Sequence, residues 1–165
     1  MKTGILAIIV AAIILTACSA SSSTAKKEKN TAEYAKTAAL IESGNYQFAV
    51  RSATPSGGKT VQLTSSYTLE ARDGTYDAYL PYYGRAYSAS YGGDGAVEFS
   101  GNPEDLKITR YDDKNKISVA FTMKSDKDQN KVTLNIGATG FGNLVVTSQK
   151  RQTISYYGLT SALKD

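Results

Sequence analysis

The hydrophobic and polar positions of this 165-residue chain divide it into three parts. Residues 3–17 form a mostly apolar run, whereas residues 19–30 have no apolar period. From Tyr46 onward apolar residues alternate with polar ones, as at Tyr46, Phe48 and Val50. A period of two is typical of half-buried β-strands. The pattern therefore predicts a β domain behind an apolar N-terminus and a polar connector.

The β pattern recurs in short runs that are separated by turn residues, mainly glycine, proline, asparagine and aspartate. Consecutive strands without helices between them predict an antiparallel meander. We expect an all-β, lipocalin-like meander barrel, because closure removes exposed strand edges; a β-sandwich is the alternative. The predicted strands lie within residues 46–50, 61–63, 67–69, 75–80, 96–99, 106–111, 117–123, 131–136, 144–147 and 153–157.

One short helix is predicted before the strands, over residues 31–43. Thr31 can cap its N-terminus, and Gly44 stands where a glycine commonly ends a helix. Tyr34, Ala38 and Ile41 form a narrow apolar stripe, which we expect to pack against the sheet.

The N-terminus has the features of a signal peptide over residues 1–17. Lys2 precedes an apolar run that is shorter than the roughly 20 residues of a transmembrane helix, so a spanning anchor is the weaker alternative. The sequence Leu15-Thr16-Ala17-Cys18 resembles a lipobox, in which the cysteine is lipid-modified before cleavage on its N-terminal side. An ordinary signal peptide is the other interpretation.

These features predict three segments: the signal peptide, a lipidated Cys18 with a flexible linker over residues 18–30, and a single β domain over residues 31–165. The N-terminal lipid makes a membrane the first expected partner. Ser19 follows Cys18, whereas an aspartate there would resemble an inner-membrane retention signal. We expect an outer-membrane protein that faces the periplasm.

The net charge of +4 and the pI of about 9.0 do not indicate nucleic-acid binding. Lys26, Lys27 and Lys29 place much of the positive charge in the connector, which leaves the predicted β domain close to neutral.

The residue types also argue against catalysis. The chain has no histidine, and its one cysteine is the predicted lipidation site, so a Ser-His-Asp triad, a thiol nucleophile and most zinc sites are excluded. The acidic pairs Glu104-Asp105 and Asp112-Asp113 fall in predicted turns. We therefore predict no catalytic residue, no metal and no cofactor, with a hydrolase as the least favoured function.

A tyrosine- and glycine-rich segment over residues 80–95 interrupts the strand rhythm. Tyrosines offer an apolar face and a hydroxyl, and an arginine can hold a carboxylate or phosphate, so the segment is a candidate ligand site. In the alternative, the tyrosines only pack over the barrel mouth, and Arg85 pairs with Asp94 or Glu98. The candidate ligand-binding residues are Tyr82, Tyr83, Arg85, Tyr87, Tyr91 and Asp94.

Four stretches of the chain are similar to an uncharacterised family of Bacteroidetes-type exported lipoproteins, known only as a domain of unknown function. They are Ile41–Phe48, Leu80–Tyr87, Tyr91–Gly93 with Phe99 and Gly101, and Arg151–Gly158. The resemblance extends from Leu40 to Gly158. It implies an exported lipoprotein and a lipocalin-like β-barrel, and it implies no activity.

The leading functional hypothesis is a non-enzymatic module that binds a small amphiphile, lipid or glycan at the barrel mouth. The alternative is an envelope interaction or assembly protein that presents residues 81–95 to another protein. A hollow interior would favour the first, and a filled interior the second.

Overall fold

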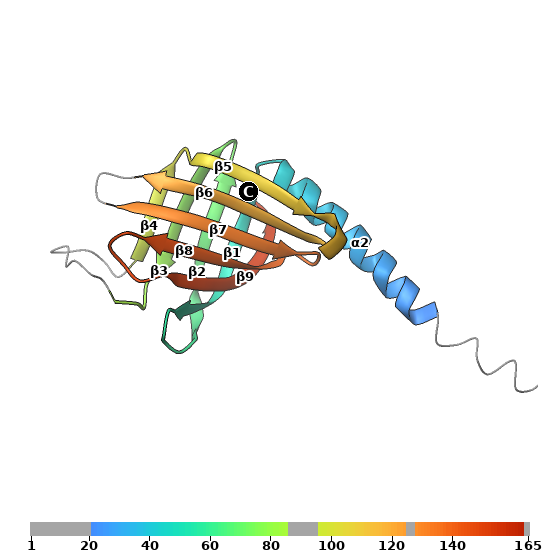
Figure 1. The fold of residues 1–165 in the computed structure, drawn as a ribbon, viewed down its shortest axis with the longest axis horizontal. Helices are drawn as coiled ribbons and strands as arrows, with labels where there is room; N and C mark the ends of the chain where they lie inside the picture. The colour runs from blue at the N-terminus through green and yellow to red at the C-terminus, as the bar shows by residue number, and fades with distance from the viewer. Residues whose placement is uncertain (1–20, 86–95, 125–127, 164–165) are drawn as a thin grey trace, which may run out of the picture.

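The computed structural model describes residues 21–85, 96–124 and 128–163, with side chains from residue 26 onward (Figure 1). In these residues one α-helix is followed by nine strands, and a short 3-10 helix lies between the fifth and sixth strands. The elements are α2 Ser21–Glu42, β1 Tyr46–Pro55, β2 Val61–Arg72, β3 Thr75–Pro81, β4 Ala96–Gly101, β5 Glu104–Tyr111, η1 Asp112–Lys114, β6 Lys116–Lys124, β7 Gln129–Gly137, β8 Phe141–Ser148 and β9 Ile154–Ala162.

All nine strands form a single antiparallel sheet in the order β4-β3-β2-β1-β9-β8-β7-β6-β5. Strands that are neighbours in sequence pair with each other, except β4 and β5, and β9 returns to pair with β1. The predicted mostly β meander with an N-terminal helix is confirmed. The sandwich alternative would need two sheets and is not adopted.

The sheet curls into a half-barrel in which β4 and β5 form the two edges. Two irregularities accompany the curvature: the pairing register shifts at Arg51 of β1, and again between Glu104 and Lys107 of β5. Bulges bend a strand and increase its twist. As a result, Phe121 of β6 reaches Tyr76 of β3, with ring centroids 4.4 Å apart.

The concave side of the half-barrel is filled by side chains. Tyr46, Phe48 and Tyr156 are fully buried there. Phe121 contacts Tyr76, and it also meets Phe99 of β4 edge-on at 6.3 Å. The described residues thus form one continuous core between the two ends of the sheet.

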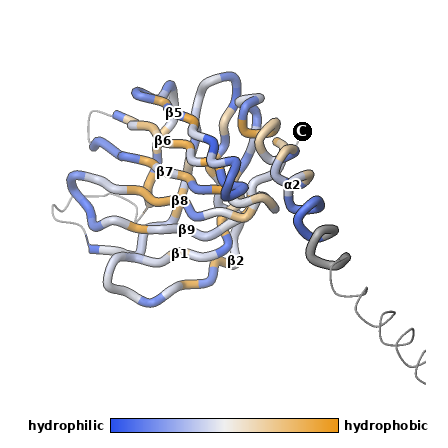
Figure 2. The backbone as a smooth tube through the Cα atoms, turned by 45° about the vertical axis from the view of Figure 1, so that its right-hand side comes forward, coloured by the Kyte–Doolittle hydropathy of each residue, from blue (hydrophilic) through white to orange (hydrophobic). Residues whose placement is uncertain are grey.

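α2 begins ten residues before the predicted start, so residues 21–30 are helical where a flexible linker was predicted. That part of the linker prediction is wrong because it relied on apolar periodicity, whereas alanine, lysine and glutamate favour helix without it. Thr31, predicted as the N-cap, lies inside the helix and donates to the Lys27 carbonyl at 3.0 Å. This hydrophilic end of α2 projects away from the sheet (Figures 1 and 2).

The C-terminal half of α2 docks on one end of the half-barrel, and the predicted stripe of Tyr34, Ala38 and Ile41 is buried there. Thr37 donates to the carbonyl of Ala138, at 2.8 Å. None of the described helices is long and apolar enough to cross a membrane.

Polar contacts complete this docking. The Tyr34 hydroxyl donates to Asp112 at 2.6 Å. Arg110 donates to Glu42 at 3.0 Å and to Asp112, and its guanidinium lies 5.6 Å from the Tyr34 ring centroid. Helix, β5 and η1 are therefore joined by one network.

Candidate functional site

Three of the six predicted ligand-binding residues lie in the described part of the chain. Tyr82, Tyr83 and Arg85 follow the end of β3. Tyr87, Tyr91 and Asp94 fall outside the described residues, as does the predicted lipidation site Cys18. The site is therefore built here from residues 82–85 and their neighbours.

Tyr82 joins this segment to the chain just before β9. Its hydroxyl lies 2.8 Å from the Arg85 carbonyl and 3.0 Å from the Gln152 carbonyl. Two further bonds join the same residues: the Gln152 amide donates to the Arg85 carbonyl at 3.0 Å, and the Arg85 amide donates to the Gln152 side chain at 3.3 Å. Tyr82 is half-buried, and its hydrogen bonds link the segment after β3 to the segment before β9.

Arg151 lies over the Tyr82 ring, with its guanidinium 5.3 Å from the ring centroid. It also donates to the carbonyl of Ala96 at the start of β4. Below it, the buried Tyr156 hydroxyl donates to the Pro81 carbonyl at 3.0 Å, and burial raises the Tyr156 pKa. The end of β3 and the starts of β4 and β9 therefore lie close together at this point.

Arg151 and Gln152 also belong to this site, although their sequence pattern did not indicate it. Both begin the run Arg151–Gly158 that carries the family resemblance, but nothing in that run indicates a contact with residues about 70 positions earlier. Their role depends on the curl of the sheet, which brings the chain just before β9 close to the end of β3 although β2 and β1 lie between these strands.

Two of the predicted ligand-binding residues in this segment are exposed to solvent. Tyr83 is 47% exposed, and Arg85 is also exposed. An exposed ring beside a guanidinium can stack on a flat ligand or hold a carboxylate or phosphate. The described residues here include no carboxylate pair, histidine or thiol with which to move a proton or attack a bond.

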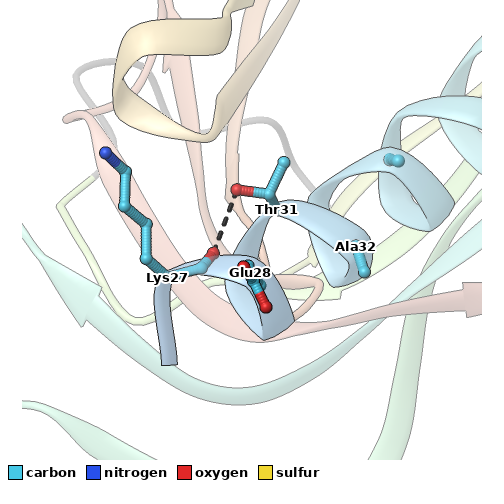
Figure 3. Close-up of a pocket in the computed structure, with 5 residues that line it drawn as sticks. Lys27, Glu28, Thr31 and Ala32 are labelled. Atoms are coloured by element: carbon cyan, nitrogen blue, oxygen red, sulfur yellow. Dashed lines mark hydrogen bonds between the residues drawn. The ribbon is translucent and has the colours of Figure 1, made fainter. Parts of the chain in front are cut away.

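Two open hollows lie outside the core. One runs along α2, between Lys27, Glu28, Thr31, Ala32 and Ala35 (Figure 3). The other lies on the outer face of β2, β3 and β4, beside Tyr79 and Glu98. Within the described ranges no group of three metal-ligating side chains occurs. Neither hollow brings together a set of groups suited to catalysis.

The ionisable groups where α2 packs against β5 and η1 perturb one another. The hydrogen bond from Tyr34 and the bonds from Arg110 hold the pKa of Asp112 below its usual range. Contacts with Glu42 and Asp112 raise the pKa of Arg110. Since Asp112 and Arg110 satisfy each other, this network joins elements and offers no free acid or base.

A family model described as a domain of unknown function, DUF4251, matches residues 28–160. A crystal structure of a DUF4251 family protein from Bacteroides eggerthii is similar to the chain, with a TM-score of 0.63 and 13% identity. The similarity covers 80% of this chain and 89% of that one, and at this identity it shows the fold alone. Comparison with curated proteins gives no match.

Proposed function

The chain belongs to the DUF4251 family, whose domain has no assigned function, and from this premise we propose a lipid-anchored envelope protein that binds a partner on its surface and catalyses no reaction. The observation that carries the proposal is the filled concave side of the sheet. Side chains occupy the place that a small ligand takes in a hollow barrel. Recognition is therefore assigned to the surface, at Tyr83 and Arg85.

The anchor in this proposal is the lipid on Cys18, and the location is the periplasmic side of the outer membrane. The signal-peptide pattern, the lipobox-like residues before Cys18 and the absence of aspartate after it support the assignment. In α2, residues 21–30 would act as a helical spacer, since a helix rises about 1.5 Å per residue. Substitution of Cys18→Ser is expected to move the protein from the membrane fraction to the soluble fraction.

A protein is the partner that we favour. Tyrosine and arginine are enriched among the residues that dominate protein interfaces. Tyr83 and Arg85 are exposed on a segment whose backbone is fixed by Gln152. Fixing the segment before binding lowers the entropy cost of ordering it in a complex.

Photo-cross-linking in intact cells tests this partner. A photoreactive residue at position 83 of the full chain is expected to yield a discrete heterologous product, and Arg85→Gln is expected to reduce it. Position 111 is the matched control, because Tyr111 is similarly exposed, at 45%, on β5. Recovery of monomer alone at position 83, or of the same product from position 111, would overturn the proposal.

A small amphiphile, lipid or glycan with an acidic group is the second candidate. Arg85 and Arg151 favour it, since both cations lie at the same end of the sheet. Native mass spectrometry of the protein extracted from its own envelope would then show a co-purifying ligand. Loss of that ligand in Arg85→Gln, with an unchanged melting temperature, would separate binding from folding.

A further inference from the structure

Two aromatic rings form a platform on the outer, convex face of the sheet, away from Tyr83 and Arg85. Phe141 of β8 and Tyr157 of β9 stack with centroids 5.8 Å apart and ring planes 7° apart. Arg51 of β1 places its guanidinium 5.0 Å from the Phe141 centroid. Tyr157 remains 49% exposed. An aromatic surface and a cation are thus held together and open to solvent.

The strand pairing explains why these three side chains meet. Arg51 occupies the register shift between Val50 and Ser52, and such bulges redirect a side chain. Tyr157 pairs with Ser52 on one side and with Asn143 of β8 on the other. A hydroxyl-bearing residue and an amide-bearing residue therefore flank the exposed ring on the neighbouring strands.

The surrounding strands have an unusual charge distribution. β1, β9, β8, β7 and β6 are consecutive in the sheet and contain no aspartate or glutamate. Figure 1 shows β6, β7, β8 and β9 side by side. The strand carboxylates lie instead on β2–β5, for example at Glu70, Asp77 and Glu98. Arg51 and Lys131 are exposed on the carboxylate-free strands.

We propose that the outer face of β7, β8, β9 and β1 is a binding site for an acidic polysaccharide. Tyr157 would stack on the apolar face of a sugar ring, and Arg51 would hold a carboxylate with its planar fork. Asn143, Thr133 and Thr147 offer amide and hydroxyl groups to the sugar hydroxyls. Adjacent strands are about 4.8 Å apart, so the four strands span about 14 Å.

Charge complementarity selects this ligand over others. Cations on these strands favour an anionic ligand, because the five strands carry no carboxylate that would compete for Arg51 or repel the incoming charge. Serine, threonine and asparagine around a single stacked pair match a hydroxyl-rich ligand more closely than the apolar centre of a protein interface. This site is separate from the surface of the proposed function and does not depend on it.

Isothermal titration calorimetry of the protein purified from its own cells in detergent micelles tests the site. The probes are a linear hexamer of galacturonic acid and neutral maltohexaose. The wild type is expected to bind the acidic hexamer at least about tenfold more tightly, the scale of one charge-assisted contact. Tyr157→Ala and Arg51→Gln are each expected to weaken that binding by about tenfold or more.

Tyr79→Ala and Arg72→Gln are the matched controls. Tyr79 is 51% exposed and also belongs to a stacked pair, but it lies on the acidic part of the sheet. Both controls are expected to bind the hexamer like the wild type. Absence of hexamer binding by the wild type, equal binding of maltohexaose, or an equal loss in Tyr79→Ala would overturn the inference. Unchanged cross-linking at position 83 in Tyr157→Ala would keep the two surfaces distinct.

Discussion

Gly158 has no room for a side chain where β9 meets β1. A Cβ at this position would lie 2.3 Å from the Ala49 carbonyl oxygen and 2.9 Å from the Phe48 ring. We expect Gly158→Ala to lower the free energy of unfolding by about 2 kcal/mol or more, because backbone must move to relieve the contact. Urea denaturation measures the change. Gly137→Ala is the control, since its Cβ would meet only the Phe141 carbonyl oxygen at 3.6 Å; an equal loss there would refute the explanation.

The hydroxyls of Tyr46 and Tyr76 are buried 3.3 Å apart. Tyr46→Phe or Tyr76→Phe leaves the remaining hydroxyl without its partner, so each is expected to cost about 1–3 kcal/mol. The double variant should cost less than the sum of the two, because it buries no orphaned hydroxyl. A double-mutant cycle by chemical denaturation measures this coupling, and strictly additive losses would contradict it.

Single residues of the site were only partly predictable. The sequence identified Tyr82, Tyr83 and Arg85 by residue type. In the structure Tyr82 links two segments of the chain, whereas Tyr83 and Arg85 face solvent. Arg151 and Gln152 could not be assigned, because their contacts depend on the curl of the sheet, which brings together segments about 70 residues apart. Alternation within a strand carries no information on that distance.

At the scale of elements, local patterns were sufficient for strands and insufficient for the helix. β6 was predicted over residues 117–123 and spans Lys116–Lys124, because its alternation is regular. α2 was predicted too short, since its N-terminal part makes no core contact that would impose an apolar period. The docked half, with Tyr34, Ala38 and Ile41, was predicted from that period.

The contact between Tyr34 of α2 and Asp112 is expected to stabilise the protein to an extent that depends on pH. The pKa of Asp112 is lowered in the folded protein, first by the Tyr34 hydrogen bond. Its contribution to stability is therefore complete above the unfolded pKa of about 3.9 and is lost as the pH falls through the lower folded value. We expect Tyr34→Phe to lower the melting temperature by a few degrees at pH 7 and by much less near pH 2.

Asp112→Asn and Asp113→Asn separate this contact from general surface charge. Both aspartates belong to η1, but only Asp112 accepts from Tyr34 and Arg110. Asp112→Asn should reproduce the pH-dependent loss, and Asp113→Asn should not. Circular dichroism melts at pH 7 and near pH 2 measure both. A loss in Tyr34→Phe that stays constant over this range would contradict the assignment to Asp112.

At the scale of the whole molecule, the sequence predicted a meander barrel, and the structure shows this meander as a half-barrel with β4 and β5 at its edges. Consecutive pairing follows from short turns, but curvature depends on bulges such as the one at Arg51, and on rings that meet across the sheet. The filled interior depends on the same contacts. Local alternation therefore determined the order of the strands, whereas long-range packing determined that the sheet is a filled half-barrel.

Because tyrosines are buried in this core, we expect the stability of the folded protein to fall at high pH. Burial raises the pKa values of Tyr46, Tyr76 and Tyr156 above the ordinary value of 10.0. Their contribution to stability is thus complete below about pH 10 and is lost as the pH rises, because the unfolded chain releases these protons first. We expect the urea midpoint to fall between pH 9 and pH 11.5, with late tyrosinate absorbance at 295 nm appearing together with loss of the β signal.

In Tyr156→Phe the fall should be shallower than in the wild type, whereas Tyr83→Phe should leave it unchanged because Tyr83 is exposed. Full tyrosinate absorbance from a still-folded sheet would show that the core does not exclude the charged form.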